Sequence, residues 1–312
     1  IKTSEYVDTE SMFYDCSSLE SVMLGNLNTT CVAGMFSGGN SLVSIDLSKL
    51  DVSNAYSANG MFRDCTNLKH IDMKWLDFSE VPGSLDSTES MFENCSSLES
   101  IDLSNIDISC VKNMRYMFRR CSSLKNINLS NMNASGATIM GEMFYDCSSL
   151  EEIDLSGIDT SSLTAMSDMF YGCESLENID LNGLDTSNVT DMSYMFHKCT
   201  NLTRLDLSSF DISNVTKINC MFQYCESLIE LDLSSFDTSS VTNMKYLFAR
   251  CKSLTELDVS KFNTSNVTNM SGIFGICLKL AELDVSNFDT SSVENMYGMF
   301  SGCSNLLTLD LS

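Results

Sequence analysis

Histidine, proline, tryptophan and basic residues are all scarce in this sequence. Its 312 residues include two His, one Pro, one Trp and 18 Lys+Arg against 42 Asp+Glu, which gives a formal net charge of −24. His70 and His197 supply too little imidazole for a histidine-based triad or a histidine-rich metal site. A surface this acidic also lacks the Lys and Arg that phosphate binding needs. The composition therefore disfavours both nucleic-acid binding and an enzyme.

Long apolar runs are missing as well. No stretch of 18 apolar residues occurs, so we expect no transmembrane segment in this chain. The first residues show no basic stretch followed by an apolar one, so we expect any secretion signal to be absent or already removed. Hydrophobic residues still make up 43% of the chain, which is enough for a folded core.

A sequence repeat of constant length runs along the chain. Phe recurs at twelve positions, and only the first and third steps between them differ in length from the others. These positions are Phe13, Phe36, Phe62, Phe92, Phe118, Phe144, Phe170, Phe196, Phe222, Phe248, Phe274 and Phe300. A fixed period of about 26 residues is typical of a solenoid, in which each coil buries its apolar side chains against its neighbours. The sequence therefore predicts about twelve coils.

Each unit can be interpreted as a strand, a turn and a helical segment. Leu205 and Leu207 flank Asp206, and this alternation predicts a short strand with one buried face. Apolar residues with the spacing of one face of a short helix occur at Met192, Met195, Phe196 and Cys199. We therefore predict an α/β repeat solenoid, with one long parallel sheet and short helical turns.

The repeat pattern MFxxCxxLxxLDLSxFDTSxVTxM resembles the BspA-like leucine-rich repeats of the DUF285, or "lactobacillus surface protein", type. Clear copies are MFHKCTNLTRLDLSSFDISNVTKINC from Met195 and LFARCKSLTELDVSKFNTSNVTNMSG from Leu247. The resemblance implies one right-handed, leucine-rich-repeat-like solenoid over residues 1–312, and the departures from the period indicate irregular coils at 1–38 and 62–92. It also implies a bacterial or protist cell-surface protein that takes part in adhesion or protein binding, without catalytic residues or a cofactor.

Two apolar columns of the repeat are expected to be structural ladders. They include Phe170, Phe196 and Phe222 in one column and Cys173, Cys199 and Cys225 in the other. The Cys column holds eleven of the 14 cysteines, and no CxxC pair of the kind used by zinc sites occurs. We therefore favour buried free thiols over a metal site or a disulfide ladder. Cys31 and Cys110 share a turn position outside this column and are expected to be more exposed.

Aspartate forms two further columns. The second of these accepts only Asp or Asn and precedes Thr-Ser or similar pairs, which predicts Asx-turns with incidental charge. The first column lies on the predicted strand and should face solvent. Its candidate binding residues are Asp102, Asp154, Asp180, Asp206, Asp232, Asp258 and Asp284. Like charges roughly 4.8 Å apart repel, so this column should raise its own mean pKa or attract cations.

Two interpretations of the first column stay open. It is either a solvated face that keeps the rod soluble, or a surface for cations or a basic ligand. Calcium is conceivable because it prefers carboxylates, but one carboxylate per coil does not enclose an ion. Thr29, Thr160, Thr186, Thr238, Thr264 and Thr290 share a slot that suggests a flat polar surface for ice or a mineral.

Other candidates carry weaker signals. Trp75 and Pro82 lie in an irregular segment and form a candidate contact region. The basic spot at Lys112, Arg115, Arg119 and Arg120 is interpreted as charge relief within an acidic surface.

The sequence as a whole predicts a non-enzymatic recognition or adhesion module that displays a rigid acidic face. Its partner would be an unidentified protein or cell-surface ligand, and an extracellular location follows from the resemblance alone. The alternative is a structural subunit that assembles head-to-tail into fibres, because no polar capping unit is visible at either end of the repeat.

Overall fold

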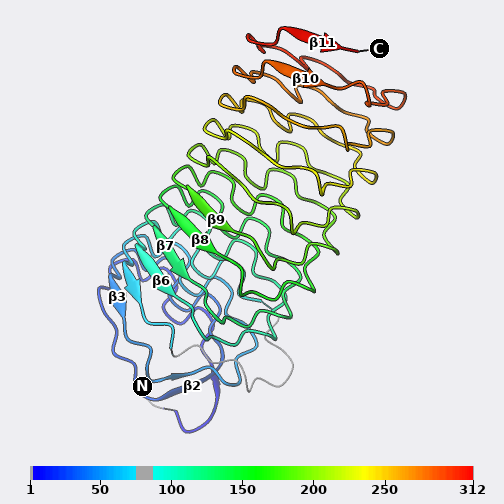
Figure 1. The fold of residues 1–312 in the computed structure, drawn as a ribbon. Helices are drawn as coiled ribbons and strands as arrows, with labels where there is room; N and C mark the ends of the chain where they lie inside the picture. Colours follow the sequence, from blue (N-terminus) through cyan, green and yellow to red (C-terminus); the bar gives the residue numbers. More distant parts are fainter. Residues whose placement is uncertain (1–2, 75–86, 312) are drawn as a thin grey trace.

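The computed structural model describes residues 3–74 and 87–311, which wind into a stack of coils (Figure 1). The strands are β1 (Val7–Asp8), β2 (Leu27–Cys31), β3 (Ser44–Ile45), β4 (Leu50–Asp51), β5 (His70–Ile71), β6 (Ser100–Asp102), β7 (Asn126–Asn128), β8 (Glu152–Asp154), β9 (Asn178–Asp180), β10 (Glu282–Asp284) and β11 (Thr308–Asp310). The fold is a β-solenoid of about eleven coils, not twelve. The twelve Phe of the repeat are separated by only eleven coil-to-coil steps.

Neighbouring coils pair in parallel with a register of one repeat. Ile101 lies opposite Ile127, and Asp154 lies opposite Asp180. In the first coils β2 pairs with β1 and with β4, and the register shifts between Val7 and Asp8. The remaining strands form the separate pairs β3-β5, β6-β7, β8-β9 and β10-β11. The prediction of a single long sheet is therefore wrong.

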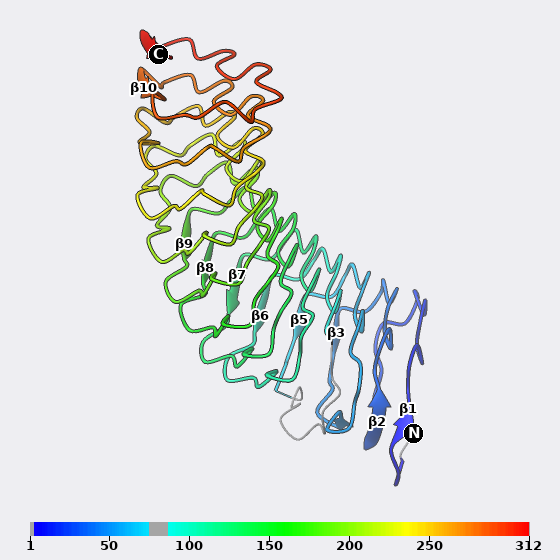
Figure 2. The ribbon, with the colours of Figure 1, turned by 90° about the vertical axis from the view of Figure 1, so that its right-hand side faces the viewer.

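The sheet is interrupted because the coils spread apart on the strand side. No backbone hydrogen bond joins residues 204–207 to 230–233, or 230–233 to 256–259. Figure 2 shows that the stack bends along its length, with β9 and β10 toward the outer side of the bend. An unbroken series of parallel bridges lies elsewhere in the coil, and runs from Ser87 through Asp191 and Lys217 to Asn295. The coils are thus joined continuously along that series and only in places along the strands.

The segment predicted as helical is a series of turns, and the described residues contain no α-helix. In an α-helix each N–H beyond the first turn bonds within the helix. Here alternate N–H groups leave the coil: those of Tyr194 and Phe196 donate to Asn219 O and Met221 O of the next coil, at 3.0 and 2.9 Å. Tyr194 and Lys198 also have φ of 59° and 61°, in the left-handed region. The prediction of an α/β fold with helical turns is therefore wrong.

Stacked Phe rings and buried thiols fill the core beneath these turns. Phe196 lies parallel to Phe170 and to Phe222, with ring centroids 5.7 and 6.1 Å apart. The Cys199 thiol donates to Phe170 O at 3.2 Å. All described cysteines are free, and Cys173, Cys199 and Cys225 are fully buried. Burial of each such Phe stabilises the fold by about 2–3 kcal/mol.

Two cysteines outside this column differ from each other in exposure. Cys31 is only 1% exposed, because it belongs to β2 and faces the core, whereas Cys110 is half-buried. The expectation that both are relatively exposed is wrong for Cys31.

Candidate functional site: the acidic strand face

The aspartates of the strand side are exposed, and each one closes a turn. The backbone N–H two residues further on donates to Asp Oδ1, at 2.8 Å for Asp154 and 2.9 Å for Asp206 and Asp232. The same bond is made at Asp102, Asp180, Asp258 and Asp284. Asn128 replaces Asp in one coil and accepts the equivalent bond at 3.1 Å. The turn therefore needs the side-chain oxygen and does not need the negative charge.

The turn lowers the pKa of the carboxyl at five of these aspartates, namely Asp102, Asp154, Asp206, Asp232 and Asp258. The pKa of Asp154 is lowered by the hydroxyl and the backbone N–H of Ser156, which both bond the ionised carboxylate. Hydrogen bonds from Ser234 lower the pKa of Asp232, and the charges of Asp206 and Asp258 oppose this only weakly. The sequence-based expectation of raised pKa values is wrong, because these bonds outweigh repulsion across solvent.

The second Asp column makes the same kind of turn. Asp185 Oδ1 accepts the backbone N–H and the hydroxyl of Ser187 at 3.0 and 2.6 Å. Thr186 follows it and is only 1% exposed, with its hydroxyl donating to Asp211 O of the next coil at 2.8 Å. Thr29, Thr160, Thr238 and Thr264 are buried in the same way. Most of the Thr column is therefore inside the coil stack, so it forms no flat surface for ice or a mineral.

A groove opens on the strand side where the coils spread apart. Its volume is about 1200 Å³, and the predicted residues Asp154, Asp180, Asp206, Asp232 and Asp258 line it, whereas Asp102 and Asp284 do not. Nine carboxylates in all line the groove, with Arg204 as the one basic residue among them. Arg204 is paired with Glu230 at 3.3 Å. Buried leucines that include Leu205, Leu231 and Leu257 form apolar lining between the carboxylates.

Sequence reasoning missed the glutamates of this groove. Glu152, Glu230 and Glu256 each lie two residues before an Asp of the first column and line the same groove. Side chains at positions i and i+2 of an extended segment point to the same face. The signal was therefore available in the strand spacing, although these positions vary from coil to coil. Trp75 and Pro82 lie outside the described residues.

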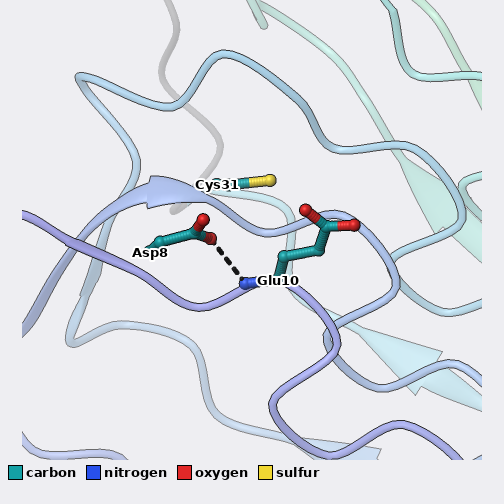
Figure 3. A group of neighbouring side chains, drawn as sticks. All are labelled: Asp8, Glu10 and Cys31. Carbon is teal, nitrogen blue, oxygen red and sulfur yellow. Dashed lines mark hydrogen bonds between the residues drawn. The ribbon is translucent and has the colours of Figure 1, made fainter.

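A second cluster of acids surrounds the Cys31 thiol. The ligand atoms of Asp8, Glu10 and Cys31 all lie within 4.8 Å of one another (Figure 3). Asp8 Oδ1 already accepts the backbone N–H of Glu10 at 2.9 Å. The pKa of Cys31 is raised, chiefly by burial and further by Asp8 and Glu10, so the thiol stays protonated. A closed structural zinc site uses four protein ligands, whereas this cluster offers three and one oxygen of Asp8 already closes a turn, so the cluster does not form such a site.

Comparison with known proteins identifies the family. The coil stack is of the leucine-rich-repeat-like class, and the chain belongs to the DUF285 family, described as "Mycoplasma protein of unknown function". The family pattern matches residues 1–85, 86–204, 138–256 and 227–311. No curated protein sequence matches the chain. The described residues form no helix that is long and apolar enough to cross a membrane.

A solved structure shows a similar fold. A leucine-rich cell surface protein from Faecalibacterium prausnitzii A2-165 is 17% identical, with a TM-score of 0.50, and the match covers 94% of this chain and 79% of that one. A leucine-rich repeat protein from Bacteroides ovatus is 18% identical, with a TM-score of 0.43 over 93% of this chain and 82% of that one.

Proposed function

We propose that this chain is a non-enzymatic recognition module whose acidic groove binds a basic segment of a protein or cell-surface partner. The observation that carries the proposal is the set of nine carboxylates around the groove between Asn126 and Asp258, with apolar lining between them. A fold of the leucine-rich-repeat-like class supports a binding role. The cell-surface description of the Faecalibacterium protein supports an extracellular location and a role in adhesion as part of the same proposal.

The chemistry of the groove favours an extended basic segment. The five Asp carboxylates of the groove are held in place by their turns, so little of their side-chain freedom is lost when a cation binds. A net charge of −24 attracts a basic partner over the Debye length, roughly 8 Å in physiological salt. Lys and Arg stems can cover Leu205 and Leu231 while their charged ends reach the carboxylates.

The test uses substitutions that remove charge and keep the turn. Asn128 shows that Asn closes the turn, so Asp180→Asn, Asp206→Asn and Asp232→Asn together remove three groove charges without breaking it. The matched control carries Asp185→Asn, Asp211→Asn and Asp237→Asn, from the second column of the same coils. The probe is a labelled peptide of alternating Lys and Ser, with an alternating Glu and Ser peptide as a negative control.

We expect the Lys-Ser peptide to bind the wild-type chain and the groove variant to bind it about tenfold more weakly, which is about 1.4 kcal/mol. The control variant should lose much less affinity. Equal losses in the two variants, or no binding of the Lys-Ser peptide at all, would overturn the groove as the recognition site.

Two other predictions stay untested. Head-to-tail assembly into fibres would show as a particle mass that rises with concentration in light scattering.

Calcium binding at the acidic column would show as heat in a titration with calcium chloride alone, and the same groove variant would abolish it.

A further inference from the structure

A column of planar groups lies on the turn side of the middle coils. The Arg119 guanidinium lies 4.9 Å from the ring centroid of Tyr145, Tyr145 lies 4.4 Å from Tyr171, and Tyr171 lies 4.5 Å from His197. Each of these residues occupies the same position in successive repeats. Of the described residues, only Arg119 Nε and His197 Nδ1 are buried side-chain nitrogens without a hydrogen bond, and they lie at the two ends of this column.

The middle coils concentrate the residues that protein interfaces favour. Six of the ten Tyr and four of the six Arg lie on these turns, at Tyr116, Tyr145, Tyr171, Tyr194, Tyr224, Tyr246, Arg115, Arg119, Arg120 and Arg250. Tyr and Arg are enriched where binding energy concentrates. The Asp columns repeat along nearly the whole chain and cannot mark one place on it. The turn side does distinguish the middle coils from the rest, because its residues differ from coil to coil.

One tyrosine and carboxylate pair on this side binds arginine from within the chain. The guanidinium groups of Arg115 and Arg119 lie 4.6 and 4.9 Å from the ring centroid of Tyr116. Both also pair with Glu142 of the next coil, at 2.7 Å from Arg115 and 3.8 Å from Arg119. Tyr224 makes a similar contact with Arg250, at 4.9 Å. The turns therefore already show how a guanidinium is held here: it lies over a tyrosine ring and beside a carboxylate.

A second pair of a carboxylate and a tyrosine makes no direct contact with a cation among the described residues. Tyr116, Glu142, Asp168 and Tyr194 occupy one repeat position in four successive coils, so the second pair has the reverse order of the first, with the carboxylate one coil before the tyrosine. The Asp168 backbone N–H donates to Ser193 O at 2.9 Å, so the two coils are in direct contact. Within the described residues no hydrogen bond or ion pair reaches the Asp168 carboxylate, and no Lys or Arg lies over Tyr194.

The residues that replace the two arginines explain this difference. Ser193 occupies the position of Arg115, and His197 that of Arg119. His197 is 6% exposed, and burial, followed by the charge of Lys198, lowers its pKa to about 4, so it is neutral. Burial, then Glu142 and Asp191, raises the pKa of Asp168 to about 6. The half-buried Asp168 carboxylate thus has no direct ion pair of the kind that Glu142 makes, although the charges of Arg115 and Arg119 act on it and partly oppose the rise in its pKa.

We propose that Asp168 and Tyr194 bind an arginine side chain of a protein partner, as Glu142 and Tyr116 bind Arg115 within the chain. Arginine is favoured over lysine because its planar guanidinium stacks on a ring and bonds a carboxylate with two N–H groups at once. The proposal rests on the protein-binding role proposed above and adds a second contact, outside the acidic groove. Tyr171 and His197 form the wall beside Tyr194, with centroids 6.4 and 5.6 Å from its ring.

The experiment is an NMR titration of the full chain with N-acetyl-arginine amide, a probe with the side chain in question and no other charge. N-acetyl-citrulline amide has nearly the same shape without the charge and serves as the control ligand. We expect saturable shifts at the amides of Asp168 and Tyr194 with the arginine probe only. Asp168→Asn should weaken binding at least about tenfold, whereas Asp159→Asn, which removes an exposed carboxylate elsewhere, should not.

A further variant supplies the arginine from within the chain. Ser193→Arg places a guanidinium where Arg115 lies in its own coil, and we expect it to abolish the shifts caused by the arginine probe. Arginine-induced shifts that persist unchanged in Asp168→Asn and in Ser193→Arg would overturn the proposal, as would equal binding of the citrulline probe. The groove variant with Asn at 180, 206 and 232 should keep the arginine shifts, so failure of this site and failure of the groove are separate results.

Discussion

The backbone N–H of Ser156 donates to Oδ1 of Asp154 at 2.8 Å, and the Ser156 hydroxyl donates to the same oxygen at 2.7 Å. Asp154 is therefore a turn-closing residue and a wall of the acidic groove at once. The two roles use different properties of one side chain, because the turn needs an oxygen acceptor and the groove needs a charge. Asn can supply the first property but not the second.

Substitution of Asp154 should separate these roles. We expect Asp154→Ala to lower the free energy of unfolding by about 1 kcal/mol, because it leaves the Ser156 N–H without its acceptor. Asp154→Asn should lower the free energy of unfolding by only about a few tenths of a kcal/mol, because the Asn side-chain oxygen still accepts the bond. Urea unfolding of the two variants beside the wild type measures the difference. Equal destabilisation by Ala and Asn would contradict a turn that depends on the oxygen alone.

The pH dependence of stability should show the unusual position of Asp168. Its folded pKa of about 6 lies above the ordinary value of 3.8, so its contribution to stability is fully present below pH 3.8 and is lost as pH rises through 6. We expect Asp168→Asn to stabilise the chain at pH 7.5 by at most about 1 kcal/mol, after allowance for solvent screening, and to have little effect near pH 3.5. Thermal unfolding at the two pH values checks this. A destabilised variant at pH 7.5 would show that Asp168 has a favourable partner.

His197 should stabilise the fold through its ring and not through Nδ1. His197→Phe keeps an aromatic ring against Tyr171 and removes the buried unpaired nitrogen, so we expect stability to stay equal or rise by about 1 kcal/mol. His197→Ala should lose about 2 kcal/mol, because it leaves a cavity beside Tyr171. Denaturant unfolding compares the two variants at pH 7.5. Greater loss in Phe than in Ala would indicate that Nδ1 has an essential partner.

Thiol reactivity should follow burial. Cys16 is exposed, whereas Cys199 and Cys225 are fully buried and have raised pKa values, with burial as the main cause. We expect a thiol reagent to modify Cys16 rapidly in the native chain and the buried column only on unfolding. Mass spectrometry of the labelled peptides assigns each site. Rapid native labelling of Cys199 would contradict a closed coil stack.

Sequence alone was enough for the family and the coil stack, because a strict repeat period brings equivalent residues into contact. It could not give the local backbone of the turns. The spacing of Met192, Met195, Phe196 and Cys199 fits a helix equally well, and the left-handed φ of Tyr194 and Lys198 has no signal in those residue types. The broken sheet was also hidden, because the bend depends on how all the coils pack (Figure 2).

The candidate sites were predicted unevenly. The Asp column was apparent because it repeats, but the sequence did not show that hydrogen bonds from Ser156 and Ser234 lower the pKa of Asp154 and Asp232. The turn-side column was missed because the position of Tyr145, Tyr171 and His197 holds unrelated residue types in the other coils, so it shows no repeating pattern. Arg115 and Arg119 were interpreted as charge relief, and the structure pairs both with Glu142. A contact role for Trp75 and Pro82 stays a prediction.

Titration of the wild-type chain with the Lys-Ser peptide, repeated with the variant that has Asn at 180, 206 and 232, tests the recognition role most directly. The groove hypothesis predicts wild-type binding that weakens strongly between about 50 and 300 mM salt, as expected for screened charges, and a variant that binds weakly at both concentrations. Wild-type affinity that does not change with salt, or a variant that binds as tightly as the wild type, would contradict it.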